Sequence, residues 1–314
     1  MTDENLLSIK AVRETAEKKA SRLQPWQGYF ELRSLEIEAL MHHVSGDLGA
    51  SMLEIGCGNG YNAALLSRRA RSMIATDLFL KSVETHTQGV AVAGELIKSL
   101  GAKSCKLVSC SGEALPFKDG SFDIVFSLYT MEHVPHKDAM AREIKRVLKP
   151  GGKAYILVPN FVERIFYPLV FYRDMISRGV SKLVKKFFRN TRSSVKKSDI
   201  YGLDLLERDT STFKAFRKAY PHFPFPEPHG AYLTYGHEVV GYMPLTWRRI
   251  FAKEGLSVKE VCTTIAIPWE ILSFIHPALP LKVYRRTLGL NIRLGRILPF
   301  KYFGNNVCLV LEKI

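Results

Sequence analysis

This 314-residue chain lacks the features that mark several other classes of protein. It has no CxxC pair and no Cys/His spacing of a metal site, so the sequence indicates neither a disulfide framework nor a bound metal. No apolar run approaches the roughly 20 residues that cross a bilayer, and the opening MTDENLLSIK contains acids where a signal peptide has an apolar stretch. We therefore expect a cytoplasmic protein that folds as one α/β domain with additions. Its five cysteines are at positions 57, 105, 110, 262 and 308.

The most informative motif is a glycine-rich stretch, LEIGCGNG, at residues 53–60. Its apolar start predicts a buried strand, and Gly56, Gly58 and Gly60 follow at alternate positions before a helical pattern over 62–69. Glycine permits positive φ and lets a ligand approach the backbone, and a helix directs its free N–H groups toward the preceding loop. The motif therefore favours a cofactor-binding turn between a strand and a helix.

Later segments continue the alternation of strands and helices. A second apolar run, 73–76, ends in Asp77, at the spacing where a doubly wound sheet places the carboxylate that accepts ribose hydroxyls. A helical period over 142–148 stops at the turn sequence KPGG. Further strands are predicted at 106–109, 122–127 and 154–158.

In order and spacing, LEIGCGNG, Asp77, EALPFKDGSFDIVFS and LKPGG resemble the class I S-adenosylmethionine-dependent methyltransferases, over about residues 50–160. The resemblance implies a Rossmann-like, doubly wound sheet of seven strands with an antiparallel last strand, and S-adenosylmethionine as the cofactor. It also implies that Glu54 and the glycine loop hold the methionine end, that Asp77 holds the ribose diol, and that Leu78 flanks the adenine. The other cofactor-binding positions implied are Gly56, Cys57, Gly58, Gly60, Ser111, Gly112, Glu113 and Ser127.

One position departs from the family pattern. Ser111 stands where the family usually has an Asp that receives the adenine amino group, and a neutral hydroxyl accepts more weakly. Either Glu113 or the Gly112 backbone compensates, or packing holds the adenine, or both side chains are only solvated loop residues. Cys57, between two glycines, is expected to be a small packing residue rather than a nucleophile.

The rest of the chain is expected to form additions to a methyltransferase core. Residues 1–45 carry two helical patterns and predict a helical cap on the sheet edge. The core is assigned to 46–160 and 235–314, with strands six and seven at 257–267 and 306–314. Subtraction leaves a basic helical lid insertion at 161–234 and an apolar and basic insertion at 268–305.

The formal net charge of +15 is concentrated in these two insertions. Residues 161–220 contain 14 Lys and Arg against 6 Asp and Glu, and residues 271–301 contain 6 against none. Apolar and basic residues interleave over 165–189 in the pattern of a basic amphipathic helix. Three interpretations stay open: a lid packed on the core, a surface for a membrane or a lipid-like substrate, and a nucleic-acid site. The last is disfavoured because no Asn/Asp-Pro-Pro-aromatic tetrapeptide follows strand four.

Methyl transfer is an in-line displacement at an activated carbon, so positioning contributes most, and a base is needed only if the acceptor keeps its proton. Glu132 and His133, just after strand four, are candidate catalytic residues, as is His237 on the segment returning from the lid. His133 either faces the substrate or only caps a turn. The candidate substrate-binding residues are aromatic: Trp26, Tyr29, Phe30 and Tyr129.

We therefore expect a methyltransferase that acts on an apolar, lipid-linked or membrane-associated acceptor, in the cytoplasm or peripherally on a membrane. The alternative is methylation of RNA or of a soluble small metabolite. A non-catalytic binding module with the same fold is disfavoured by the intact Glu54, Gly56, Gly58, Gly60 and Asp77. The sequence leaves the acceptor atom, the base and the oligomeric state open.

Overall fold

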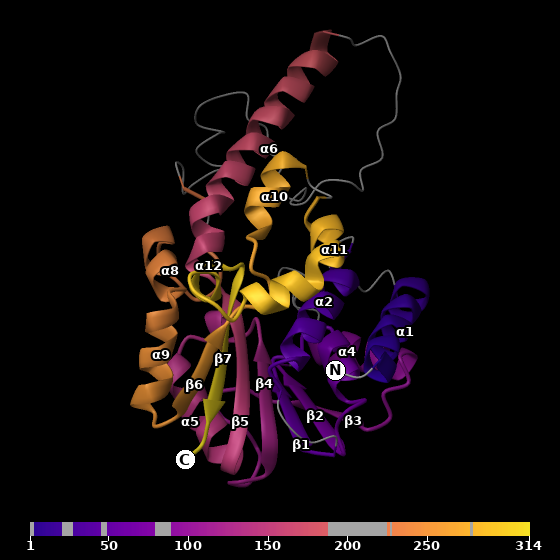
Figure 1. Ribbon diagram of the computed structural model, residues 1–314, viewed down its shortest axis with the longest axis vertical. Helices are drawn as coiled ribbons and strands as arrows, with labels where there is room; N and C mark the ends of the chain where they lie inside the picture. Colours follow the sequence, from indigo (N-terminus) through magenta and orange to yellow (C-terminus); the bar gives the residue numbers. More distant parts are fainter. Residues whose placement is uncertain are drawn as a thin grey trace.

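The structure, a computed structural model, describes residues 3–20, 28–44, 49–78, 89–187, 225–226, 228–276 and 279–314. Its centre is a sheet of β1 (Ser51–Ile55), β2 (Ser72–Asp77), β3 (Cys105–Ser109), β4 (Phe122–Leu128), β5 (Leu148–Pro159), β6 (Ser257–Cys262) and β7 (Asn306–Glu312). The strand order is β3-β2-β1-β4-β5-β7-β6, and only β7 runs antiparallel to its neighbours among these seven strands (Figure 1). The predicted doubly wound sheet with an antiparallel last strand is confirmed.

Both faces of the sheet are covered by helices, which explains why its central strands β1, β4 and β5 are mainly apolar and buried. Successive residues of a strand point to opposite faces. Met52 therefore packs in one core cluster and Leu53 in the other. The first cluster is covered by α1 (Asp3–Lys19), α2 (Tyr29–Met41), α3 (Tyr61–Leu66) and α4 (Gly89–Ser99). The second is covered by α5 (Lys137–Val147) and α9 (Pro244–Lys253).

Strand β6 is shorter than the predicted 257–267. It ends at Cys262 because the next residues bond to a side chain instead of a strand. The Thr263 hydroxyl and the Thr264 amide both donate to Asn306 Oδ1, at 2.9 and 3.0 Å. These bonds turn the chain toward the helices above the sheet.

The helices of the two insertions stand above the carboxyl ends of the strands (Figure 1). Helix α6 (Phe161–Phe187) follows β5 directly, so the helix predicted from residue 165 begins at Phe161. It packs against α10 (Trp269–Ile275) and α8 (Tyr235–Gly241). The second insertion also contributes α11 (Leu279–Leu294) and α12 (Phe300–Phe303). The remainder of the first insertion, 188–224, lies outside the described residues.

Candidate active site

The glycine loop rests on the end of the neighbouring strand β2. The amides of Gly56 and Cys57 both donate to the Thr76 carbonyl at 2.8 Å, and the Gly58 amide donates to Asp77 Oδ2 at 2.6 Å. Because β1 and β2 pair in parallel with Ile55 opposite Thr76, both chains leave the sheet at the same edge. The structure thus brings the predicted loop and the predicted ribose carboxylate together.

The three glycines of the loop serve different purposes. A Cβ on Gly56 would lie 2.2 Å from the Thr130 side chain, and one on Gly60 would lie 3.0 Å from the Ala93 carbonyl oxygen. Close packing therefore requires glycine at both positions. Gly58, by contrast, has φ +55° and nothing within 4 Å of its Cβ position. Its open side leaves room for a ligand to approach the backbone.

The carboxyl group of Glu54 is buried without a hydrogen-bond partner in the described part of the chain. Its side chain is fully buried, and neither carboxylate oxygen has a hydrogen-bond partner among the described residues. Burial, with a smaller contribution from Asp77, raises the pKa of Glu54 to about 8. A buried carboxyl without a donor is costly, so the site calls for a ligand that supplies one. The ammonium of a methionine group fits this need, and Asp77 offers oxygens to a ribose.

The remaining predicted cofactor residues fall into two groups. Leu78 is 47% exposed beside Asp77, where it can cover a ring. Cys57 is buried in the core, and burial raises the pKa of its thiol, which suits packing and not nucleophilic attack. Ser127 is also fully buried, inside β4 opposite Ile156.

The structure shows what occupies the Ser111 region. The Ser111 hydroxyl accepts a hydrogen bond from the Glu113 amide at 3.2 Å, and Glu113 Oε1 accepts one from the His136 amide at 2.9 Å. Glu113 thus holds the loop that leads into α5. A Cβ on Gly112 would lie 2.9 Å from Ile55, so this turn packs tightly on the end of β1.

A cavity of about 260 Å³ lies over the carboxyl ends of β4 and β5. It adjoins the cofactor loop through Thr130, whose hydroxyl donates to the Gly56 carbonyl at 3.1 Å. Its walls come from α2, the segment after β4, the end of β5, α6, the segment before α8, and α10. The lining residues are Leu32, Arg33, Glu36, Tyr129, Glu132, His133, Pro159, Glu163, His229, Trp269, Glu270 and Asn305.

Tyr129, one of the predicted substrate-binding residues, lines the cavity in a strained conformation. It is the only residue other than glycine with positive φ in the described part of the chain, at 57°. The Arg33 guanidinium lies 4.1 Å from its ring centroid, and its hydroxyl donates to Glu36 and accepts from Asn306 Nδ2 at 3.0 Å. These contacts join α2, the end of β4 and β7, and they offset the backbone strain.

The other predicted substrate-binding aromatics behave differently. Phe30 is fully buried in the core, with its ring centroid 4.6 Å from that of Tyr61, so its assignment to the substrate pocket is wrong. Tyr29 contacts Phe30 and Arg33 and does not line the cavity. Trp26 lies outside the described residues.

Glu132 and His133 both line the cavity. Glu132 is buried, and burial raises its pKa to about 8. His133 Nε2 lies 3.9 Å from Glu132 Oε1, and burial together with Lys137 lowers the pKa of the imidazole. The pair therefore combines a neutral carboxyl with a neutral imidazole near pH 7.

His237 is exposed on α8 and does not line the cavity, so the returning segment contributes a different histidine. His229 occupies that place, and its ring centroid lies 4.7 Å from that of His133. Two contacts hold the segment there: the Ala231 amide donates to the Glu132 carbonyl at 2.9 Å, and the His229 amide donates to Glu238 Oε1 at 2.9 Å.

Sequence reasoning missed the charged residues of the cavity wall: Arg33, Glu36, Glu163 and Glu270. One signal was available, since Glu270 is the only acid within 268–305. An acid that interrupts an apolar and basic segment is a candidate for a buried or functional position.

The model of the methyltransferase domain family matches residues 53–156, which contain the glycine loop, Asp77 and Glu132. Together with the strand order and the orphaned Glu54, this match identifies a class I S-adenosylmethionine-dependent methyltransferase domain. The cofactor of this domain is S-adenosylmethionine.

Several curated proteins are similar to this domain. The chain is 29% identical to sterol 4-C-methyltransferase strm-1 of Caenorhabditis elegans, over 40% of this chain and 37% of that protein. It is 30% identical to the ubiquinone/menaquinone biosynthesis C-methyltransferase UbiE of Stenotrophomonas maltophilia (strain R551-3), over 46% of this chain and 56% of that protein. It is 31% identical to methyltransferase GfsG of Streptomyces halstedii, over 38% of this chain and 41% of that protein. The chain thus spans 37% to 56% of the length of these relatives.

A solved S-adenosylmethionine-dependent methyltransferase from Aquifex aeolicus has 14% sequence identity to this chain. The superposition has a TM-score of 0.43 and covers 98% of both chains. The fold assignment rests on the strand order and not on this likeness.

Proposed function

We propose that this protein transfers the methyl group of S-adenosylmethionine to a small-molecule acceptor whose nucleophilic end enters the cavity beside Glu132. The observation that carries the proposal is the adjacency of two sites. Tyr129 lines the 260 Å³ cavity, and the next residue, Thr130, donates a hydrogen bond to the Gly56 carbonyl in the loop that follows the buried Glu54. A donor site and an acceptor site in contact are what methyl transfer requires.

Bound S-adenosylmethionine supplies a methyl group on a sulfonium, which becomes a neutral thioether as the acceptor atom forms its new bond to carbon. Glu54 and Asp77 hold and orient the cofactor at its two ends. Glu132 has a pKa of about 8, so it is its ionised fraction that can take the proton that the acceptor atom loses, and a base works best when its pKa lies near the operating pH. His133 lies between Glu132 and solvent and can pass that proton outward.

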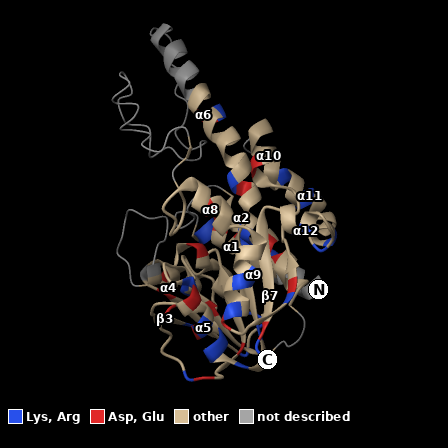
Figure 2. Cartoon of the chain, turned by 90° about the vertical axis from the view of Figure 1, so that its left-hand side faces the viewer, with Lys and Arg blue, Asp and Glu red and all other residues tan. Residues whose placement is uncertain are grey.

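The body of the acceptor is proposed to be apolar. Exposed apolar side chains lie on α6 and α10, the helices above the cavity, and Figure 2 shows uncharged stretches of these helices between their charged residues. These residues are Ile165, Leu169, Ile176, Ile271, Phe274 and Ile275. The printed names of two relatives, a sterol and a ubiquinone/menaquinone methyltransferase, support an apolar acceptor.

We further propose that the protein reaches such an acceptor at a membrane surface. Among the described residues, no helix has the length and apolar character to pass through a bilayer. Peripheral contact needs only an apolar surface with basic residues beside it. The exposed side chains of Lys282, Arg286 and Arg293 on α11 supply such residues.

The test uses two measurements. Calorimetry with S-adenosylmethionine should show binding that Asp77→Ala weakens and that Glu254→Gln, just after α9 and away from the site, leaves unchanged. Incubation with a methyl-labelled cofactor and separate lipid, RNA and small-molecule extracts, followed by mass spectrometry, should place the label in the lipid fraction. Label in RNA or in a soluble metabolite would refute the apolar acceptor, and failure to bind the cofactor would refute the whole proposal.

A further inference from the structure

The cavity contains an unusual excess of carboxyl groups. Four glutamates line it, Glu36, Glu132, Glu163 and Glu270, together with a single cationic residue, Arg33. Arg33 Nη1 lies 2.5 Å from Glu36 Oε2, so that pair is neutral. Three carboxyl groups therefore line the cavity without an ion pair to a lysine or arginine of its lining.

Two further cations lie near the cavity but do not line it. Arg164 follows Glu163 on α6, and its Nη2 lies 2.8 Å from Glu238 Oε2 in a buried ion pair that joins α6 to α8. Lys137, close enough to Glu132 to lower the pKa of that carboxyl, donates to the Val134 carbonyl at 3.0 Å.

Two of the three carboxyl groups also have one oxygen without a hydrogen-bond donor. Glu132 Oε2 and Glu270 Oε2 have no partner among the described residues, although the side chains of Glu132 and Glu270 are only 1% and 6% exposed. They come from opposite sides, the segment after β4 and the start of α10. Burial raises the pKa of both carboxyl groups, which shows that the cavity stabilises neither as an anion by itself.

We propose that this cavity binds the acceptor through a protonated nitrogen, held between Glu132 and Glu270 with Glu163 beside them. An ammonium offers three hydrogen-bond donors, and its positive charge would stabilise these carboxyl groups as anions. Tyr129 and Trp269 add aromatic surface, on which cations also bind. The inference rests on the proposed function only in treating the cavity as the acceptor site. The acceptor is then a molecule with an apolar body and a basic nitrogen.

The test uses three probes that share one ring: benzylamine, benzyl alcohol and benzoate. Each is titrated into the protein, with and without S-adenosylhomocysteine, and binding is followed by ligand-observed NMR. Benzylamine should bind at least tenfold more tightly than benzoate. Glu132→Gln and Glu270→Gln should each weaken benzylamine about tenfold while leaving S-adenosylhomocysteine affinity unchanged, and Glu254→Gln should change neither.

Each other outcome overturns the inference in a defined way. If benzyl alcohol equals benzylamine, the cavity selects hydrogen-bond donors and not charge. If benzoate equals benzylamine, or if both glutamine variants bind benzylamine normally, the carboxyl groups do not select the ligand. If no probe binds while S-adenosylhomocysteine does, the inference fails and the proposed function stands.

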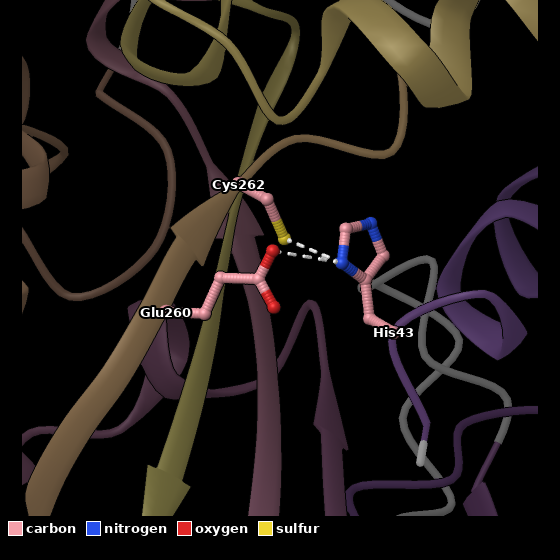
Figure 3. A group of neighbouring side chains, drawn as sticks. All are labelled: His43, Glu260 and Cys262. Carbon is pink, nitrogen blue, oxygen red and sulfur yellow. Dashed lines mark hydrogen bonds and ion pairs between the residues drawn. The ribbon is translucent and has the colours of Figure 1, made fainter.

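A second site rests on independent residues at the opposite end of α2. Three side chains converge there: His43, after α2, and Glu260 and Cys262, two residues apart on β6 (Figure 3). His43 Nδ1 lies 3.4 Å from Cys262 Sγ and 3.3 Å from Glu260 Oε1. Glu260 and Cys262 point to the same side because side chains alternate along a strand.

We propose that these three residues bind one zinc ion. Tetrahedral bonds of about 2.0 to 2.3 Å separate neighbouring ligands by roughly 3.3 to 3.8 Å, and both measured distances lie in this range. Nitrogen, thiolate and carboxylate are ligands of zinc. Glu260 is partly exposed, so solvent has access to the site and can supply a fourth ligand. The ion would fasten the end of α2 to β6.

Zinc titration of the purified protein should give one bound ion per chain, measured against a chelating dye. Cys262→Ser and His43→Ala should weaken binding more than tenfold, and Cys105→Ser, on β3, should not. Glu260→Gln, at a partly exposed position, tests the site without disturbing the core. Cobalt should give a thiolate charge-transfer band that Cys262→Ser removes. Absence of stoichiometric binding, or binding unaffected by these variants, would show that the three side chains form only a hydrogen-bonded cluster.

Discussion

Asp77 Oδ2 accepts a hydrogen bond from the Gly58 amide at 2.6 Å, which ties the glycine loop to the end of β2. The other oxygen, Oδ1, accepts from the Leu78 amide at 2.7 Å. Each carboxylate oxygen can accept more than one bond. Asp77 can therefore shape the loop and still receive ribose hydroxyls, so the loop and the cofactor depend on the same side chain.

Asp77→Ala should weaken S-adenosylmethionine binding at least tenfold. A hydrogen bond to a charged group contributes about 1.5 to 3 kcal/mol, and about 1.4 kcal/mol corresponds to a factor of ten. Calorimetry measures the affinity, and circular dichroism checks that the variant is folded. Unchanged affinity in a folded variant would remove Asp77 from the cofactor site.

Cofactor binding should release a proton from Glu54. Its pKa of about 8 in the free protein means that the carboxyl is protonated at pH 6 to 7, whereas an ammonium ligand favours the ionised form. Affinity should therefore rise between pH 6 and 7.5, by up to about tenfold per pH unit. Calorimetry in two buffers of different ionisation enthalpy counts the proton. Glu54→Gln should abolish both the slope and the release, and a pH-independent wild-type affinity would contradict the assignment.

Ser111→Asp should leave cofactor affinity equal or improve it. The added carboxylate restores the acceptor that the family usually presents to the adenine amino group. The aspartate can still accept the bond from the Glu113 amide that the serine hydroxyl now receives. Calorimetry measures the affinity. The matched control is Ser111→Ala, which removes the hydroxyl that stabilises the turn but adds no acceptor for the adenine. A severe loss in Ser111→Asp would mean that the site has no room for a carboxylate.

Liposome binding should rise with the content of anionic lipid and fall with salt. Basic residues near such a surface contribute about 1 kcal/mol each. Replacing Lys182, Lys185 and Lys186 of α6 by Gln should weaken sedimentation with these liposomes and leave cofactor affinity intact. The same change at Lys103, Lys106 and Lys118, exposed at the amino ends of the strands, is the control. A wild-type protein that ignores liposomes at low salt would refute the membrane proposal, and a gel shift with RNA would favour nucleic acid.

Local patterns were sufficient for the sheet and the cofactor loop. The strand β1, the glycines after it and Asp77 after β2 lie within 27 residues, and the chain geometry of one strand–turn–helix–strand unit places them together. The length of β6 was beyond such reasoning, because it depends on Asn306, more than 40 residues further along.

Most residues that line the acceptor cavity could not be predicted from the sequence. Phe30 and Tyr129 are both aromatic and adjacent to predicted elements, yet Phe30 packs in the core and Tyr129 lines the cavity. Whether the Phe30 side chain points into the core or into the cavity depends on how α2 packs across the sheet. Likewise His229 and not His237 reaches the cavity, because Gly230 fits against the Glu132 carbonyl.

The sequence alone thus determined the alternation of strands and helices and the position of the glycine loop, because short-range spacing and periodicity encode them, and its resemblance to the class I methyltransferases implied the full sheet and the cofactor. Only the tertiary structure decided the chemistry of the acceptor site. Glu132, Glu163 and Glu270 come from three separate segments, and their shared burial in one cavity raises the pKa of each. Burial and mutual proximity are properties of packing, and no local pattern in the chain contains them.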